Sequence, residues 1–430
     1  MTEVKECSAL HALPLPCSIL RGWPWDVETA TVHDTIYRGE SWPRITVVTP
    51  SYNQAQFIEE TIRSVLLQGY PNLEYIIIDG GSTDGSVEII RKYEPWLTFW
   101  VSEEDRGQSH ALNKGFRRAT GEILAWLNSD DIYQPGALAE VAARFRAHPE
   151  CGLIYADSRF IDDQSRPIRD IVTQQYGLES LVLSQEYLPQ QSTFFTARAF
   201  AEQGALDEKL HYAMDFDLWL RLVTAYPYRR AAGVWSGFRL SASSKTVAQG
   251  HRFWPEIAQV LHAPIWQERI PADLHARALR EAQFIAGIEL TRAGDVESGI
   301  RSLDQSLGSG IYPFGGLLNC VYMTIDMLDQ PVAGDVNAPN TAPTLAAWLR
   351  YTGASKANRS LQEYVRAVCT VHSYIHDDLG TARRLGVRAV IASHDFRCNP
   401  KLLGIVGKSL MGRTILNWGR AVRGHDRDAQ

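Results

Sequence analysis

Short apolar runs alternate with helical patterns between residues 44 and 127, and this alternation constrains the fold more than any other feature of the chain. The runs are of strand length: Ile45–Val48, Tyr75–Ile78, Phe99–Val101 and Ile123–Leu127. Segments between them place apolar residues at three- and four-residue spacing, as in a helix with one buried face. Strands joined by helices and short connections form right-handed crossovers. The sequence therefore predicts an α/β domain with a mostly parallel, twisted sheet.

Polar loops follow these runs directly. Ile123–Leu127 ends in the segment Asn128 to Asp131, and Tyr75–Ile78 ends in a glycine-rich loop from Asp79 to Ser86. Because ligands of open α/β sheets bind outside the carboxyl ends of the strands, we expect both loops to lie close to Tyr52, which follows the first strand. Adjacent carboxylates at this edge suit a divalent cation on a phosphorylated ligand. Both loops are also ordinary turn sequences, so a solvated turn is the alternative interpretation.

Missing patterns exclude several classes of function. The loop from Asp79 to Ser86 lacks the GxGxxG spacing of a dinucleotide site, and the chain lacks the P-loop pattern. A formal net charge of -6 provides no field for bulk nucleic-acid binding. The six cysteines lie far apart without a CxxC pair, which predicts no zinc site and a reduced, cytoplasmic setting. No apolar run reaches the roughly 18 residues that predict a membrane span.

Two further segments carry candidate functional groups. Asp215 precedes a helical pattern that starts at Phe216, where the helix dipole favours a carboxylate. Helix capping explains this residue as well as catalysis does. Arg239 and Lys245, with several hydroxyls around them, suit phosphate oxygens and equally suit a surface loop.

Five short motifs occur in order between Arg44 and Thr246, under half of the chain. They are Val48-Thr49-Pro50-Ser51-Tyr52-Asn53, Ile78-Asp79-Gly80-Gly81-Ser82-Thr83-Asp84, Gly107-Gln108-Ser109-His110-Ala111-Leu112-Asn113-Lys114-Gly115, Trp126-Leu127-Asn128-Ser129-Asp130-Asp131 and Met214-Asp215-Phe216-Asp217-Leu218-Trp219. Each motif is weak alone, and together they resemble the family 2 glycosyltransferases. The resemblance implies a GT-A (Rossmann-like) fold, a nucleoside diphosphate sugar donor, usually a UDP sugar, and Mg²⁺ or Mn²⁺.

The same resemblance implies roles for individual residues. Pro50 and Tyr52 would line the base pocket, and Asp79 would contact the base. Asp130 would ligate the metal, with Asp131 sharing that role, and Asp215 would act as the general base of an inverting, single-displacement transfer. The other residues expected around the donor are Asn53, Ser82, Asp84, Gln108, Asn113, Lys114, Asn128, Ser129 and Lys245.

Two departures from the family pattern keep a second interpretation open. Asn128 stands where the family commonly has Asp, and Ser241 stands where similar sequences often have His. These differences leave a non-catalytic sugar-nucleotide binder, or a scaffold, as the alternative. The arginine-tryptophan motif of processive synthases is absent after Asp215, which favours transfer of a single sugar to a glycan or lipid-linked acceptor in cell-surface polysaccharide synthesis.

The remaining chain predicts two flanking regions. Residues 1–43 read as an arm packed on the glycosyltransferase domain, which we place at 44–248. Residues 249–430 read as an irregular α-helical domain, with helices at Leu274–Thr291, Val296–Leu307, Leu345–Tyr351, Leu361–Tyr374 and Leu379–Ile391. The basic amphipathic segment Lys401–Arg423 is typical of a helix docked on its own domain, and it also suits peripheral contact with the cytoplasmic face of the inner membrane.

Overall fold

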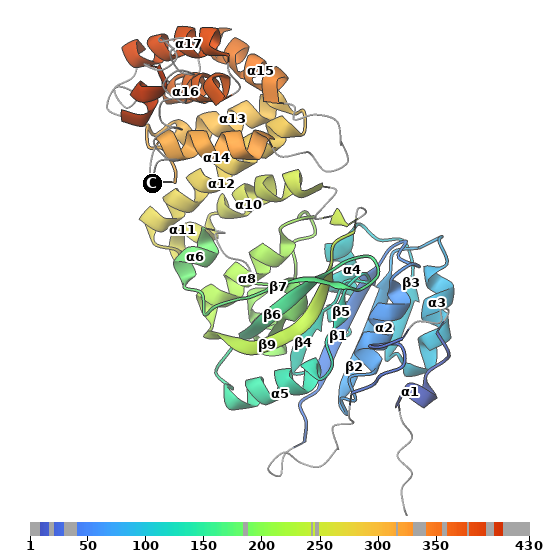
Figure 1. Ribbon diagram of the computed structural model, residues 1–430. Coiled ribbons are helices and arrows are strands. Elements are labelled where there is room, and N and C mark those ends of the chain that lie inside the picture. The colour runs from blue at the N-terminus through green and yellow to red at the C-terminus, as the bar shows by residue number, and fades with distance from the viewer. Residues whose placement is uncertain are drawn as a thin grey trace, which may run out of the picture. The chain divides into compact units, whose positions relative to one another are not determined.

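The chain divides into two compact units, Met1–Val247 and Ala248–Gln430, which Figure 1 colours from blue to red. The computed structural model describes residues 9–16, 21–29, 41–183, 188–241, 244–245, 249–314, 317–329, 341–354, 359–375, 378–392 and 400–406. The first unit is built around a sheet, and the described part of the second unit is helical.

A nine-stranded sheet forms the centre of the first unit. Its strands are β1 (Ile45–Ser51), β2 (Leu73–Asp79), β3 (Phe99–Ser102), β4 (Ile123–Trp126), β5 (Ile132–Tyr133), β6 (Leu153–Ile161), β7 (Pro167–Ile171), β8 (Thr193–Thr196) and β9 (Tyr228–Arg239). They are ordered β3-β2-β1-β4-β8-β6-β9-β5, and β7 also pairs with β6. Strands β3, β2, β1 and β4 are parallel, which confirms the predicted crossover units.

The other half of the sheet mixes directions. Strand β8 runs antiparallel to both β4 and β6, whereas β9 runs parallel to β6. β5 and β7 add antiparallel pairs to β9 and β6. A surface loop was one of the two interpretations of the segment around Arg239, and it is wrong for this residue, which is the last of β9.

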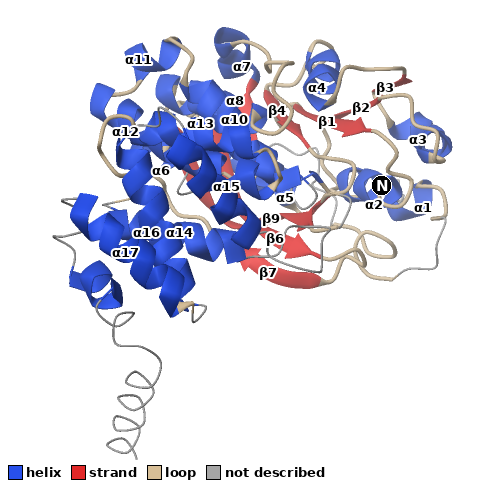
Figure 2. Ribbon diagram, turned by 90° about the horizontal axis from the view of Figure 1, so that it is seen from above, coloured by secondary structure: helices blue, strands red, loops and turns tan. Residues whose placement is uncertain are grey.

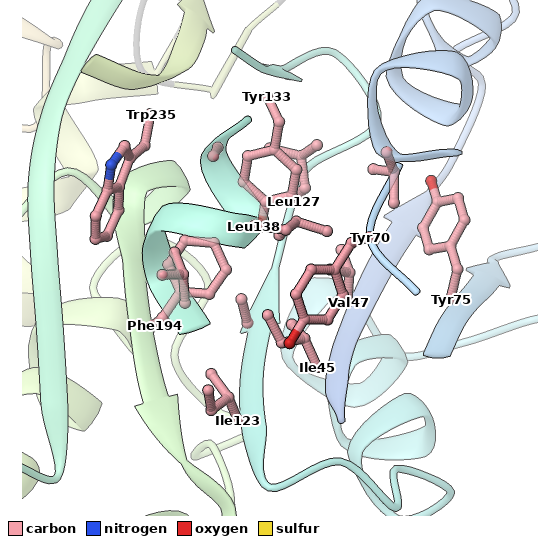
Figure 3. Close-up of a cluster of buried hydrophobic side chains, with 14 of the residues drawn as sticks. Ile45, Val47, Tyr70, Tyr75, Ile123, Leu127, Tyr133, Leu138, Phe194 and Trp235 are labelled. Carbon is pink, nitrogen blue, oxygen red and sulfur yellow. The ribbon is translucent and has the colours of Figure 1, made fainter. Parts of the chain in front are cut away.

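One face of the sheet carries the main hydrophobic core. Helices α2 (Ile58–Leu66), α3 (Ser86–Tyr93) and α5 (Ala137–Ala147) bury their apolar residues against it. Figure 3 shows this core, in which Ile45, Val47 and Ile123 from the parallel strands lie near Tyr133 and Phe194. Tyr133 and Phe194 stack with ring centroids 5.7 Å apart, so the core extends into the antiparallel half.

The opposite face is aromatic. It is covered by α4 (Gln108–Phe116), α7 (Ala197–Gln203) and α8 (Met214–Ala225), and Figure 2 shows α4 and α7 across the sheet from α2 and α3. Trp126 stacks on Trp219 of α8, with centroids 5.3 Å apart, and Phe116 meets both Trp126 and Phe195 edge to face. Gly115 permits this close packing, because a Cβ there would lie 2.4 Å from a methyl group of Val48.

The described parts of the N-terminal arm contact a buried arginine of α2 in the same unit. Arg63 of α2 is 1% exposed and donates to the backbone oxygens of Pro14, Pro24 and Trp25, at 3.1, 3.0 and 3.0 Å. Short helix α1 (Ala9–Ala12) belongs to this arm. The arm therefore supplies three acceptors to a buried guanidinium whose Nη1 also donates to the Tyr93 hydroxyl at 3.3 Å.

The remaining elements of the first unit are short, and those of the second unit are mostly longer helices. In the first unit they are the 3₁₀ helices η1 (Glu94–Trp96) and η2 (Gln190–Ser192), and α6 (Leu178–Val182). The second unit contains η3 (Gly250–Arg252), α10 (Phe253–Leu261), α11 (Ile265–Arg269), α12 (Ala272–Arg292), α13 (Val296–Leu307), α14 (Leu317–Asp329), α15 (Thr341–Ala354), α16 (Arg359–Ile375) and α17 (Leu379–Ala392). These helices confirm the predicted helical region, and Phe284, Trp348 and Tyr364 lie in its core.

The second unit has no described membrane span. Within the residues that the structure describes in either unit, no helix is long and apolar enough to cross a bilayer. The predicted amphipathic segment Lys401–Arg423 lies outside the described residues after Val406. Its proposed membrane contact therefore stays a prediction.

Candidate active site

The loops after β1 and β2 are joined by hydrogen bonds at the carboxyl edge of the sheet. Asn53 accepts from the backbone N–H of Thr83 at 2.9 Å and donates its own N–H to Ser82 Oγ at 2.8 Å. The Ala55 N–H donates to Asp84 at 2.8 Å. The structure thus brings together Asn53, Ser82 and Asp84, as the topology predicts.

Asp79 is committed to its own loop. Its side chain is fully buried and accepts four hydrogen bonds, from the backbone N–H groups of Gly81 and Ser82 at 3.1 and 2.9 Å and from the hydroxyls of Ser82 and Ser102 at 2.5 and 2.7 Å. This arrangement fixes the loop between β2 and α3 to the end of β3. Both carboxylate oxygens are therefore occupied by protein donors.

Asp84, five positions after Asp79, also binds donors of its own loop. It accepts from both the backbone N–H and the hydroxyl of Ser86, at 3.0 and 2.6 Å. Burial works to raise the pKa of Asp84, but the hydrogen bonds from Ser86 and Ala55 outweigh it and lower the pKa. The residue before the first helical turn of α3 is Gly85, so Asp84 anchors the helix start from one position further back.

Pro50 and Tyr52 differ in exposure. Pro50 is buried in β1 beside Ile78, whereas Tyr52 leaves 63% of its surface exposed just after the strand. Gly80 lies beside Tyr52, since a Cβ on Gly80 would approach Tyr52 Cδ2 to 3.3 Å. An exposed aromatic ring next to bare backbone provides a flat surface on which a planar group can stack.

Asp130 and Asp131 follow β4, and their carboxylates have different surroundings. Asp131 is buried and accepts the backbone N–H of Arg239 at 2.9 Å and a hydrogen bond from Gln191. Asp130 is half-buried, and its carboxylate accepts no hydrogen bond from another described residue. Burial raises the pKa of both groups, and the charge of Asp130 raises the pKa of Asp131 further. Ser129, between them and Asn128, is also buried.

The surroundings of Asp130 fit a divalent cation in part. A carboxylate that is partly buried without a donor is destabilised in its charged form, and a hard cation would remove that cost. Across the described residues no cluster of three or more His, Cys, Asp or Glu side chains could hold a metal by itself. A metal here would therefore need oxygens from water or from its ligand to complete its coordination.

Arg239 is a structural residue that the sequence analysis assigned to possible phosphate contact. The side chain is fully buried and forms an ion pair with Glu60 of α2, with 2.7 Å between Nη2 and Oε2. Its Nε donates to the carbonyl of Asp130 at 2.7 Å, and its guanidinium lies 4.6 Å from the ring centroid of Phe57. Buried in this way, Arg239 cannot reach phosphate oxygens, and that interpretation is corrected.

A directed chain of side-chain amides links the end of β4 to Lys245. Lys245 Nζ donates to Gln108 Oε1 at 3.0 Å, Gln108 Nε2 donates to Asn128 Oδ1 at 2.7 Å, and Asn128 Nδ2 donates to Gln190 Oε1 at 3.2 Å. Gln190 Nε2 then donates to the carbonyl of Trp126 at 2.7 Å. An ammonium can only donate and a carbonyl can only accept, so the two ends fix the orientation of every amide between them.

Three residues that were predicted to surround the sugar nucleotide therefore lie together. A fourth residue of this chain of amides, Gln190, was not predicted from the sequence. Gln108, Asn128 and Lys245 come from α4, the loop after β4 and the chain after β9. The position of Gln190, three residues before the buried strand β8, gave no indication of an amide pairing with Asn128.

Asn113 and Lys114 of α4 are engaged elsewhere. The Asn113 amide exchanges two hydrogen bonds with the backbone of Leu206, at 2.9 and 3.1 Å. Lys114 forms an ion pair with Glu103 at 2.9 Å. Lys114 also lines a cavity with Ile78, Val101, Glu103, Arg117 and Arg118, none of which belongs to the amide chain or the Asp130 loop.

Asp215 lies in the first turn of α8 and is half-buried. Its Oδ1 accepts the N–H of Phe216 at 2.8 Å. The neighbouring Asp217 forms an ion pair with Arg221 at 2.8 Å, and Arg221 also donates to the carbonyl of Gln203. Of the two carboxylates in this turn, Asp217 is thus part of a structural network.

Comparisons with known proteins give the same assignment as the motifs. Residues 46–204 match the family model described as Glycosyl transferase family 2. A glycosyltransferase of Rickettsia typhi, named as uncharacterized, is 28% identical over 188 residues, which cover 42% of this chain and 59% of the relative. TuaG of Bacillus subtilis, a glycosyltransferase assigned provisionally by its name to teichuronic acid biosynthesis, is 35% identical over 129 residues, covering 29% and 51%.

Two further similarities extend over different shares of the chain. Chondroitin synthase of Escherichia coli is 28% identical over 195 residues, which cover 44% of this chain and 27% of that enzyme. Staphylococcus aureus TarS, solved in complex with UDP-GlcNAc, aligns with 80% of this chain and 90% of that chain at 15% identity and a TM-score of 0.44.

The matched region spans at most 59% of the length of the three curated relatives above. The family-model match, residues 46–204, lies wholly within the first unit and contains β1 to β4, apart from Ile45, with the polar loops that follow them. Four of the five motifs lie within it. Residues 46–204, within the first unit, therefore match glycosyltransferase family 2.

Proposed function

We propose that the protein is an inverting glycosyltransferase that moves a single sugar from a nucleoside diphosphate sugar, most simply a UDP sugar, to a glycan or lipid-linked acceptor. The observation that carries this proposal is the carboxylate of Asp130 at the carboxyl edge of the sheet, which accepts no hydrogen bond from another residue that the structure describes. The exposed Tyr52 follows β1, and the cationic Lys245 follows β9 and contacts Gln108 at the start of α4. An aromatic surface, an acidic group and a cation are the features that a base, a metal and a diphosphate require.

The charge of the leaving group explains why these residues belong together. A departing nucleoside diphosphate carries dense negative charge, which Mg²⁺ or Mn²⁺ bound to Asp130 would neutralise. Lys245, held by Gln108, adds a second positive group beside that position. Asp131 stays bonded to Arg239 and keeps the loop in place.

Asp215 is the proposed general base. An acceptor hydroxyl is a poor nucleophile until a positioned carboxylate takes its proton. Asp217 is tied to Arg221 by an ion pair, and the resemblance of the Met214–Trp219 motif to the family supports Asp215 as the base. A direct displacement then inverts the anomeric centre and needs no enzymic nucleophile, unlike the two-carboxylate retaining hydrolases.

Cell-surface polysaccharide synthesis is the proposed setting. Two relatives, TuaG and chondroitin synthase, carry names that refer to polysaccharides, which supports a glycan acceptor. A cytoplasmic protein with peripheral contact to the inner membrane through Lys401–Arg423 would meet a lipid-linked acceptor there.

The alternative is a sugar-nucleotide binder without transferase activity. It is favoured by Asn128, whose amide is bonded to Gln108 and Gln190 and supplies no charge for a metal. The helical second unit would then act as a scaffold for partner enzymes.

Substitution of Asp215 separates the two functions. We expect Asp215→Asn to bind the donor as tightly as wild type and to lose transfer by several orders of magnitude, because only proton removal is affected. Asp163→Asn, which removes an exposed carboxylate in the turn before β7, is the matched control. Near-normal transfer by Asp215→Asn would refute the assignment of the base.

A further inference from the structure

We propose that Asp105, in the loop between β3 and α4, selects the nucleobase of the donor by accepting a hydrogen bond from a ring N–H group. The inference rests on the proposed function, since it assumes a nucleoside diphosphate at this edge of the sheet. It assigns the ligand a base with a protonated ring nitrogen on its pairing edge, as in uracil, thymine or guanine, in preference to cytosine.

The residue expected to contact the base is not available for it. Asp79 is fully buried, and its carboxylate already accepts four hydrogen bonds from Gly81, Ser82 and Ser102. Turning it toward a ligand would leave three donors of the loop unsatisfied. Base recognition by a carboxylate therefore needs another residue at this edge.

Asp105 borders the same space as Tyr52. A Cβ added to Gly80 would lie 2.7 Å from Asp105 Oδ2 and 3.3 Å from Tyr52 Cδ2, so the two side chains meet beside a residue that has no side chain. The loops after β1, β2 and β3 converge here. The N–H of Gly80 donates to the Ser51 carbonyl at 2.8 Å, and the N–H of Glu103 donates to the Asp79 carbonyl at 3.0 Å. A planar base stacked on the exposed Tyr52 ring would turn one edge toward this carboxylate.

The orientation of the Asp105 carboxylate is fixed on one side and open on the other. Oδ1 accepts the backbone N–H of Gly107 at 2.7 Å. Oδ2 accepts no hydrogen bond from the residues that the structure describes, and Asp105 is half-buried. An ionised carboxylate has only acceptors, so Oδ2 matches the N3–H of uracil or thymine and the N1–H of guanine, and it opposes the unprotonated N3 of cytosine.

Asp105→Asn reverses this preference without changing shape. The Gly107 N–H needs an acceptor, so the amide oxygen would take the place of Oδ1 and the NH₂ group would face the base. A donor there matches N3 of cytosine and opposes N3–H of uracil. Glu104→Gln, which removes one exposed charge at the adjacent position, is the matched control.

Calorimetric titration of the full chain with UDP, GDP, dTDP and CDP, in the presence of Mn²⁺, tests the proposal. We expect wild type and Glu104→Gln to bind at least one of UDP, GDP and dTDP about tenfold or more tightly than CDP. In Asp105→Asn this ratio should fall by about tenfold to hundredfold, with CDP binding retained or improved. Retained CDP binding also shows that the variant is folded.

The outcomes separate this inference from the proposed function. An unchanged ratio of UDP, GDP or dTDP to CDP affinity in Asp105→Asn would overturn the role of Asp105 and leave donor binding intact. Preference of wild type for CDP would overturn it in the same way. Failure of wild type to bind any nucleoside diphosphate would instead refute the proposed function, on which the inference depends.

Discussion

Glu60 and Arg239 form an ion pair between α2 and the end of β9, with 2.7 Å between the charged atoms and 179 positions between the residues. Both side chains are almost completely buried, at 7% and 0% exposure. The pair also holds the hairpin between β6 and β7, because Ser165 donates to Glu60 and Arg239 donates to the Asp162 carbonyl at 2.8 Å. Arg239 also donates to the Asp130 carbonyl, and this hydrogen bond fixes the loop that is proposed to bind the metal.

Removal of this arginine should destabilise the first unit strongly. Arg239→Met leaves the carboxylate of Glu60 buried without its cation, which typically costs about 3 to 5 kcal/mol. Scanning calorimetry should show the transition of the first unit at lower temperature. Arg166→Ala, which removes the exposed Arg166 from its surface pair with Asp162, should leave that transition unchanged. Equal stability of Arg239→Met and wild type would contradict the role of the pair.

Gln190→Glu tests the direction of the amide chain. A neutral carboxyl can replace the amide, because its O–H donates to the Trp126 carbonyl and its C=O accepts from Asn128. Folding should therefore raise the pKa of the introduced group above its unfolded value. Its stabilising contribution is then complete below the unfolded pKa and is lost as the pH rises through the folded pKa.

Thermal unfolding at several pH values measures this effect. Gln190→Glu should approach wild-type stability near about pH 4 and fall below it at pH 7. Gln267→Glu, at an exposed position of α11, is the control and should show no such divergence. A deficit that does not change with pH would mean that the chain has no fixed direction.

Asp130→Asn should stabilise the protein in the absence of metal. Burial raises the pKa values of Asp130 and Asp131, so the stability contributed by their neutral forms is present below the usual value of 3.8 and is lost as the pH rises through the folded values. At pH 7 the variant carries one charge fewer and should melt at higher temperature than wild type. Mn²⁺ should raise the melting temperature of wild type and of Asp163→Asn, and it should not raise that of Asp130→Asn. Equal stabilisation of Asp130→Asn by Mn²⁺ would place the metal elsewhere.

Arg63→Ala should release the N-terminal arm. The substitution removes the donor for three arm carbonyls, those of Pro14, Pro24 and Trp25. We expect faster tryptic cleavage after Arg21, followed by mass spectrometry, and an intermediate rate for Arg63→Lys, which keeps the charge with fewer donors. Identical cleavage rates in all three proteins would show that Arg63 does not hold the arm.

Local patterns predicted the elements that are stabilised by neighbours in sequence. The parallel strands and α2 were visible because buried strands and amphipathic helices have characteristic periods. The Val296–Leu307 helix matches to the residue, and the Asp295 side chain caps it by accepting the Ser298 N–H at 3.1 Å.

Contacts between distant segments could not be predicted in this way. Strand β9 is held by pairing with β6, about 75 positions away, and Arg239 pairs with Glu60 of α2, 179 positions away. The sequence also could not show which polar loop residues face a ligand. The carboxylates of Asp79 and Asp84 accept hydrogen bonds within their own loop, whereas Asp105 was not considered in the sequence analysis.

The most direct test of the central claim is nucleotide release from a panel of UDP, GDP and dTDP sugars, measured with Mn²⁺, with Mg²⁺ and with chelator. We predict metal-dependent release from at least one donor, even as slow hydrolysis without acceptor, and loss of that release in Asp130→Asn. Tight donor binding without release under any condition, also when membrane extract supplies acceptors, would contradict it and would identify a sugar-nucleotide-binding protein instead.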